Sequence, residues 1–146
     1  MSTKKTELNI RLHSIEELGY EPPLNGTKGG DVDDMGVALQ IQAKNNILSL
    51  LIEIVYLKQK EALSKLNVKF DYEIEQLDNI IHVIDENSIR FKVDIIPDLF
   101  RLSMDTMRGI YYEKLKNTAL SGHIVPLINS KTILGMIHKD QKEKAE

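Results

Sequence analysis

The chain has 146 residues, a net charge of −3, a hydrophobic fraction of 42% and no cysteine. A chain of this length usually forms one domain that folds without a metal ion or a disulfide. The lack of cysteine excludes disulfides and Cys-ligated zinc, and the lack of a basic surplus argues against binding to nucleic acid or to a membrane surface.

The first predicted element is a strand near the N-terminus. Leu8, Ile10 and Leu12 alternate with polar residues, which predicts a strand with one buried face. Pro22 ends it, because proline donates no hydrogen bond to a neighbouring strand. Residues 24–34, rich in Gly and Asp, are predicted to be a loop.

Targeting and membrane-spanning segments are not predicted. The N-terminal residues are polar and lack the apolar stretch of a signal peptide. The most apolar stretch, 47–57, is too short for a transmembrane helix, which needs about 20 residues. We therefore expect a cytoplasmic protein with no membrane insertion, a single domain over 1–146 and flexible tails at 1–6 and 139–146.

Three further strands are predicted, linked by short turns. Alternation indicates one strand at 37–43, a second at about 48–57 and a third at 62–77. Turn residues stand at 44–46 and 58–60. Consecutive strands joined by short turns favour an antiparallel meander.

The strand at 48–57 is largely apolar on both faces. Leu50, Ile52 and Ile54 share one face, whereas Leu51 and Val55 share the other. A strand that is covered on one side only should carry polar residues on its outer side. We therefore expect the second face to be covered by something else, such as another chain.

A long helix is predicted from Pro97 to Lys116, because proline is favoured at the first helical position. The preceding segment, 78–95, fits either a short helix or a strand. The apolar residues of the long helix cover roughly 220° of its circumference, although one packed face needs only about 100°. We expect this helix to lie between its own sheet and a second surface, with an oligomer interface formed by Leu99, Phe100, Leu102, Met104, Thr106, Met107, Ile110 and Tyr111.

A last helix is predicted at 131–144. Asn129 and Ser130 offer side-chain oxygens for its N-cap, and Ile133, Leu134 and Ile137 form an apolar stripe. The predicted fold class is α+β, a four-stranded antiparallel sheet with two helices packed on one face.

Motifs of catalysis are not found. The four histidines stand at no metal-ligand spacing, and the acidic pairs 16–17 and 33–34 are typical of solvated turns. The glycine-rich loop lacks a phosphate-binding signature. We expect no enzyme activity, catalytic residue, metal or cofactor. The apolar surplus indicates core, oligomer interface and a groove for apolar clients, and its division among the three stays open.

Three short motifs occur in the same order as in a known family. Residues 17–22, ELGYEP, are similar to an acidic-aromatic-proline run at the end of a first strand, and 107–110, MRGI, to an Arg-Gly in a main helix. Residues 125–129, VPLIN, followed by Ile133-Leu134, are similar to a Pro-x-Asn run that leads into a last helix. Together they resemble the SecB family of protein-export chaperones, particularly its shorter SecB-like members.

The resemblance implies a homotetramer, built as a dimer of dimers, that holds unfolded preproteins in apolar grooves without ATP. In this family the main helix lies between sheets at the subunit interface, which would account for the wide apolar arc. The groove residues that the resemblance implies are Leu127, Ile128, Ile133, Leu134 and Ile137, together with Leu51 and Val55.

The resemblance also implies a contact with the SecA motor. Glu17 and Glu21 match by spacing the acidic residues that face SecA in the family, although solvated strand-end carboxylates explain them equally well. The Lys- and Glu-rich C-terminal tail differs from the SecA-docking tail of the family. One alternative is therefore a SecB-like chaperone dedicated to the antitoxin of a toxin–antitoxin system, and another is an oligomeric adaptor or structural protein without clients.

Overall fold

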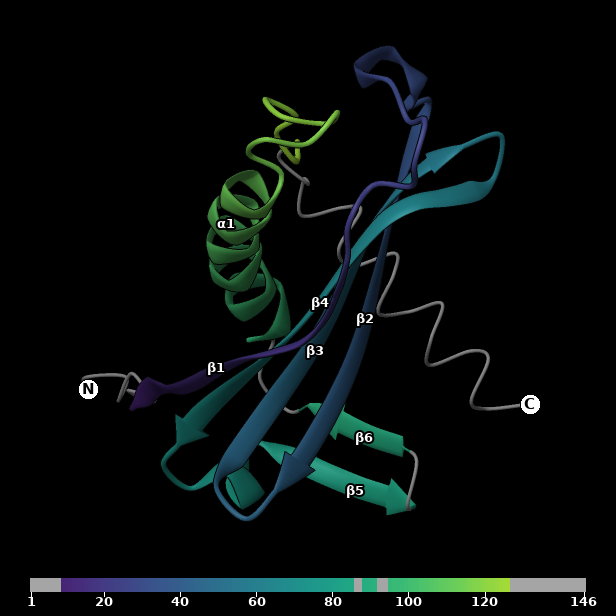
Figure 1. The fold of residues 1–146 in the computed structure, drawn as a ribbon. Helices are drawn as coiled ribbons and strands as arrows, with labels where there is room; N and C mark the ends of the chain where they lie inside the picture. The colour runs from purple at the N-terminus through teal and green to yellow at the C-terminus, as the bar shows by residue number, and fades with distance from the viewer. Residues whose placement is uncertain (1–8, 86–87, 92–94, 127–146) are drawn as a thin grey trace, which may run out of the picture.

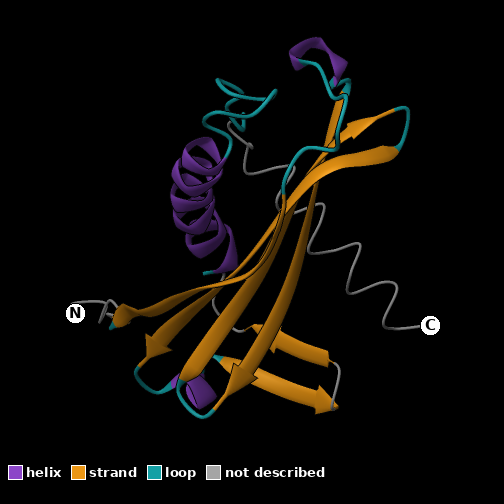
Figure 2. Cartoon of the chain, viewed as in Figure 1, coloured by secondary structure: helices purple, strands orange, loops and turns teal. Residues whose placement is uncertain are grey.

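The computed structural model describes residues 9–85, 88–91 and 95–126. Their centre is a four-stranded antiparallel sheet in the order β1-β4-β3-β2, formed by β1 (Ile10–Glu21), β2 (Asp34–Lys44), β3 (Ile47–Lys58) and β4 (Glu61–Ile74). Helix α1 (Ile96–Lys114) lies along one face of this sheet (Figure 1). A small hairpin of β5 (Ile81–Asp85) and β6 (Ser88–Phe91) stands at one end of the sheet, and two 3-10 turns, η1 (Gly29–Asp31) and η2 (Leu77–Asn79), lie in the connections (Figure 2).

Strands β2, β3 and β4 form the predicted meander. β2 and β3 pair without interruption from Asp34 opposite Leu57 to Lys44 opposite Ile47. Asn45 lies in the turn between them at positive φ, a conformation that asparagine tolerates and tight hairpins require. The side chains that alternate toward α1 are buried: Leu48, Leu50, Ile52, Ile54 and Tyr56 of β3, and Leu66, Val68, Phe70, Tyr72 and Ile74 of β4.

Strand β1 pairs with β4 and not with its neighbour in the sequence, β2. Its register shifts twice, between Leu12 and Ser14 and between Glu17 and Gly19. The expected buried face of this strand is wrong for Ile10 and Leu12, which are 37% and 44% exposed. Both lie on the α1 side of the sheet, but α1 packs over the neighbouring strands and leaves this end of β1 uncovered (Figure 1).

Helix α1 begins at Ile96, with Pro97 in its first turn as predicted. Its N-terminal half buries Leu99, Phe100 and Met104, which confirms an apolar face against the sheet. The preceding segment, which fitted helix or strand, forms η2 and the β5–β6 hairpin.

The described part of the chain therefore has one α-helix, where two were predicted for the whole chain. The second predicted helix, at 131–144, lies outside the described residues. The predicted tails at 1–6 and 139–146 lie outside them as well.

Three tyrosine hydroxyls lie in the core between α1 and the sheet. The Tyr111 hydroxyl donates to Ser64 Oγ at 2.7 Å, and the hydroxyl oxygens of Tyr72 and Ser103 are 2.6 Å apart. Tyr56 is 3% exposed, and its hydroxyl has no hydrogen-bond partner. Burial raises the pKa of all three tyrosines, and for Tyr72 and Tyr111 the serine hydrogen bonds lower the pKa by less.

Candidate functional site

An apolar strip lies on the face of the sheet turned away from α1, which we call the outer face. Leu51, Val55 and Leu57 of β3 point there and are partly buried. Val55 stands opposite Gly36 of β2, where an added Cβ would come within 2.9 Å of Val55 Cγ1. The glycine therefore gives Val55 room over β2. We define the outer strip as Leu51, Val55 and Leu57 with Gly36 and Ala38 of β2.

The other half of the outer face, over β1 and β4, is polar. Arg11 of β1 forms an ion pair with Glu73 of β4. The Asp71 carboxylate accepts hydrogen bonds from Ser14 Oγ at 3.0 Å and from Ser49 Oγ at 2.5 Å. The Lys69 ammonium nitrogen lies 3.9 Å from the same carboxylate. The outer face thus changes from paired polar groups on β1 and β4 to the apolar residues of β3, with Gly36 and Ala38 beside them among the otherwise polar outer residues of β2.

A second apolar surface lies on the α1 side, in a trough between α1 and β1. Tyr20, Gly109, Ile110, Glu113 and Lys114 line this trough. Exposed apolar side chains continue it along β1 and along the same flank of α1; they are Ile10, Leu12, Ile15 and Leu102. We call the trough and these four residues the α1–β1 surface.

Gly109 makes a notch in this surface. It lies inside α1 and is exposed, and a Cβ added there would meet nothing within 4 Å. A glycine in a helix interior costs about 1 kcal/mol relative to alanine. The packing of the described chain does not require a glycine at this position.

The eight helix residues predicted for an oligomer interface divide into two groups. The first group, Leu99, Phe100, Met104, Met107 and Tyr111, is buried in the core of this chain. The second group, Leu102, Thr106 and Ile110, lies on the flank toward β1, and Leu102 is 59% exposed. The interface role stays a prediction, and the second group is the part of the set that a partner can reach.

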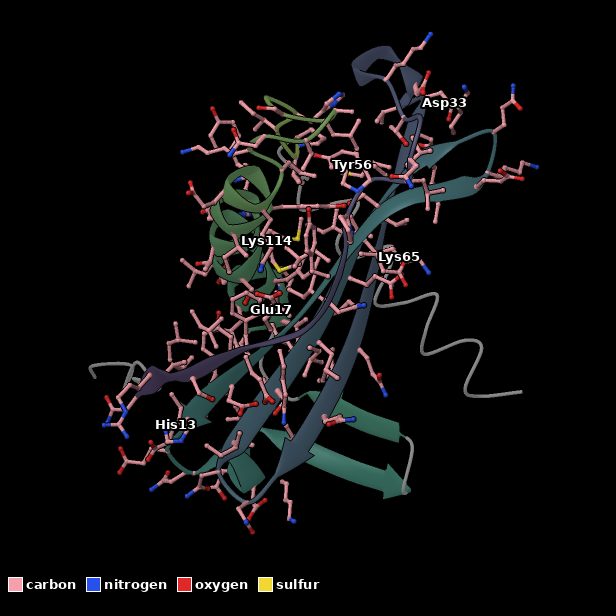
Figure 3. All side chains as sticks on the ribbon, viewed as in Figure 1. His13, Glu17, Asp33, Tyr56, Lys65 and Lys114 are labelled. Carbon is pink, nitrogen blue, oxygen red and sulfur yellow. The ribbon has the colours of Figure 1, made fainter. Side chains whose placement is uncertain are left out.

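The two acidic residues predicted to face SecA lie in different surroundings. The Glu17 carboxylate forms an ion pair of 2.8 Å with Lys114, whose ammonium group also lies over the Tyr20 ring (Figure 3). Glu21 is exposed at the end of β1, on the outer face opposite Lys65. The structure therefore ties Glu17 to the end of α1 and leaves Glu21 open to solvent.

The client-binding residues predicted in the C-terminal segment, Leu127, Ile128, Ile133, Leu134 and Ile137, lie outside the described residues. Arg108 holds the chain immediately before them. Its Nε donates to the carbonyl of Val125 at 2.7 Å and its Nη2 to that of Pro126 at 3.4 Å, while its Nη1 pairs with Asp105 at 2.7 Å. The other two predicted client-binding residues, Leu51 and Val55, lie together in the outer strip.

Metal-binding and membrane-spanning features were searched for in the described residues. Among residues 9–85, 88–91 and 95–126, no three acidic or histidine side chains gather as a metal site would require. In the same part of the chain, no helix combines the length and the hydropathy needed to cross a bilayer. His123 stands at no metal-ligand spacing to another histidine in the sequence. In the structure its Nε2 lies 2.8 Å from the Gly29 carbonyl oxygen, which connects η1 to the segment after α1.

Comparison with known protein families and with curated proteins finds no match. Among solved structures, the chain is similar to the Rv1957 SecB-like chaperone of Mycobacterium tuberculosis in complex with a ChAD peptide from the Rv1956 HigA1 antitoxin. The TM-score is 0.50 at 10% identity, over 82% of this chain and 88% of that chain. At this identity the likeness shows the fold alone, so the chain has a SecB-like fold.

Some surface residues were missed by the sequence reasoning. Ile10 and Leu12 had the pattern of a buried strand face, yet they are exposed beside α1, and Ile15 joins them on this side after the register shift between Leu12 and Ser14. The two register shifts in β1 and the course of α1 over the neighbouring strands set this exposure. Neither leaves a local signal in the sequence, although the unusual glycine at 109 could have pointed to an open helix flank.

Proposed function

We propose that this protein is a cytoplasmic, ATP-independent chaperone that holds extended polypeptide clients against apolar surface. The observation that carries the proposal is the pair of separate apolar surfaces on a domain with a SecB-like fold. One is the outer strip, and the other is the α1–β1 surface. The two surfaces lie on opposite sides of the sheet, so self-association through one leaves the other open to a client.

The proposed client surface is the outer strip, and Leu127 and Ile137 keep the client-binding role that the resemblance implies for them. Holding a client needs no chemistry, because each apolar Å² removed from water contributes about 25 cal/mol. Many weak contacts of this kind bind extended chains without reading their sequence. The aliphatic residues of the strip, together with Gly36 and Ala38, suit this task because they present few polar groups to an apolar client.

We assign the α1–β1 surface to one interface of a homotetramer built as a dimer of dimers, and the second interface that such an assembly needs is not assigned. Its exposed residues Leu12, Ile15 and Leu102 would be buried between copies, which removes an apolar surface that a lone domain would expose to water. The notch at Gly109 allows close approach of a second copy to the helix. This assignment uses Leu102, Thr106 and Ile110 from the predicted interface.

Two cellular roles, which differ in the client that is held, are compatible with this proposal. The resemblance implies unfolded preproteins on their way to Sec-dependent export, with SecA as a partner. A chaperone dedicated to an antitoxin is the second candidate, favoured because the solved structure of similar fold is a complex with an antitoxin peptide. The engagement of Glu17 by Lys114 also leaves less free charge for a motor contact. Identification of the neighbouring genes separates the two roles.

The test combines a holding assay with a measurement of mass. We expect the purified full chain to be a tetramer by light scattering and to suppress aggregation of a chemically unfolded protein without ATP. The double variant Leu51→Asp with Val55→Asp should lose holding and keep the tetramer, whereas Gln42→Asp, on the outer face of β2 but outside the strip, should change neither.

Each failure has a distinct meaning. A monomer would contradict the assembly, and a tetramer without holding activity would favour the adaptor alternative. Full holding by the double variant would move the client away from the outer strip. The C-terminal segment is tested in the same way with Leu127→Asp and Ile137→Asp combined, which should also abolish holding and keep the tetramer.

A further inference from the structure

One carboxylate interrupts the outer strip. Glu53 lies on β3 between Leu51 and Val55 and points to the same face. Its neighbours across the strands are Ala38 of β2 and Asn67 of β4. Neither neighbour is a cation. Glu53 therefore places a negative charge at the border between the apolar and the polar halves of the outer face.

Glu53 differs from Asp71 and Glu73, the acidic residues on the outer face of β4, in having no partner. Asp71 accepts two hydroxyl hydrogen bonds, and Glu73 pairs with Arg11. In the described structure Glu53 is partly buried but makes no ion pair within 4 Å and no hydrogen bond. Solvent or a bound partner therefore has to satisfy this carboxylate.

The nearest cations of the outer face are diagonal to Glu53. Lys65 and Lys69 of β4 stand one position to either side of Asn67 on this face. Lys69 lies 3.9 Å from the Asp71 carboxylate, and β1 places Glu16 opposite Lys69 and Glu21 opposite Lys65. Figure 3 shows Lys65 on the side of the sheet away from α1. These two lysines thus have acidic neighbours of their own on the β1 side.

We propose that Glu53 selects clients, so that the outer strip prefers an extended apolar segment that carries a lysine or arginine. The inference rests on the proposed client-holding function. A client laid along the strip removes water from Glu53, which is unfavourable unless the client supplies a cation or a hydrogen-bond donor. A neutral client leaves the carboxylate without a partner, and an acidic client adds repulsion.

The test uses three fluorescein-labelled apolar peptides that differ only at a central position, which is Lys, Met or Glu. Affinities are measured by fluorescence anisotropy with the full-length protein at low and at high salt. We expect the wild-type protein to bind the Lys peptide about tenfold more tightly than the Met peptide and the Glu peptide most weakly. High salt should reduce this preference.

Variants assign the preference to one residue. Glu53→Gln should bind the Lys and Met peptides equally, and Glu53→Lys should prefer the Glu peptide. Glu16→Gln, a matched loss of one carboxylate on the outer face of β1, should keep the wild-type order. Equal affinities of the three peptides for wild type, or an unchanged preference in Glu53→Gln, would overturn the role of Glu53 while client holding stands. Failure of all three peptides to bind wild type would overturn client holding on the strip and the selection with it.

Discussion

Removal of the Tyr56 hydroxyl should stabilise the protein. The residue is 3% exposed and its hydroxyl has no hydrogen-bond partner, although the unfolded chain would hydrogen-bond it to water. A buried unsatisfied polar group costs about 1–3 kcal/mol. Phenylalanine keeps the ring contacts, which have centroid distances of 5.1 Å to Tyr111 and 5.6 Å to His123. We expect Tyr56→Phe to raise the free energy of unfolding by about 1 kcal/mol and Tm by about 2–4 °C.

Two matched variants give the opposite sign. Tyr111→Phe removes the hydrogen bond to Ser64, and Tyr72→Phe removes the one shared with Ser103. Tyr72→Phe leaves the buried Ser103 hydroxyl without this partner, and Tyr111→Phe leaves Ser64 with only its hydrogen bond to the Glu21 carbonyl, so each should lower the free energy of unfolding by about 1 kcal/mol. Urea unfolding followed by circular dichroism measures all three at one protomer concentration, because the stability of an oligomer depends on concentration. A loss of stability in Tyr56→Phe similar to that in Tyr111→Phe would refute the reasoning, since it would mean that the hydroxyl is hydrogen-bonded in solution.

Further predictions concern pH, the C-terminal exit and the helix flank. Burial raises the folded-state pKa of the core tyrosines, so the unfolded chain loses their protons first as pH rises. The free energy of unfolding, measured by urea titration at each pH, should therefore be constant up to about pH 9 and fall above about pH 10. This fall should be less steep in Tyr111→Phe, which has one core tyrosine fewer. Arg108→Ala should speed hydrogen exchange around Val125 and leave β3 amides unchanged, because the guanidinium holds two carbonyls there; equal protection in both proteins would show that the segment is held otherwise. Gly109→Ala should stabilise the helix by about 0.5–1 kcal/mol yet weaken self-association in sedimentation velocity; undiminished association would place the interface away from the notch.

Local pattern was sufficient to locate the main elements. Period-two alternation identified the four strands of the sheet, and short turns identified the antiparallel order of β2, β3 and β4. Pro97 marked the start of α1. The apolar character of both faces of β3 predicted that its second face is covered; Leu51 and Val55 lie on that face and are partly buried, and what covers it stays a prediction. These features depend on neighbours in the sequence, which is why they could be predicted.

The placement of β1 could not be predicted in this way. Its pairing with β4 joins residues far apart in the sequence, and its two register shifts change which side chains face α1. Ile10 and Leu12 precede these shifts and point to the α1 side as their pattern predicts, yet they are exposed because α1 does not cover this end of β1. The lone carboxylate of Glu53 is a similar case, because its lack of a partner depends on which residues of β2 and β4 stand opposite.

The sequence by itself determined the strands, the long helix and a surplus of aliphatic residues with no sign of catalysis. The tertiary structure decided how the described part of that surplus is divided. It buries Phe100, Met104 and Met107 in the core, and it leaves Leu102 beside β1 and Val55 on the outer face. Periodicity in the sequence shows which apolar side chains share a face of a strand or helix. Whether that face is buried, and against which segment, depends on the packing of segments that are distant in the sequence.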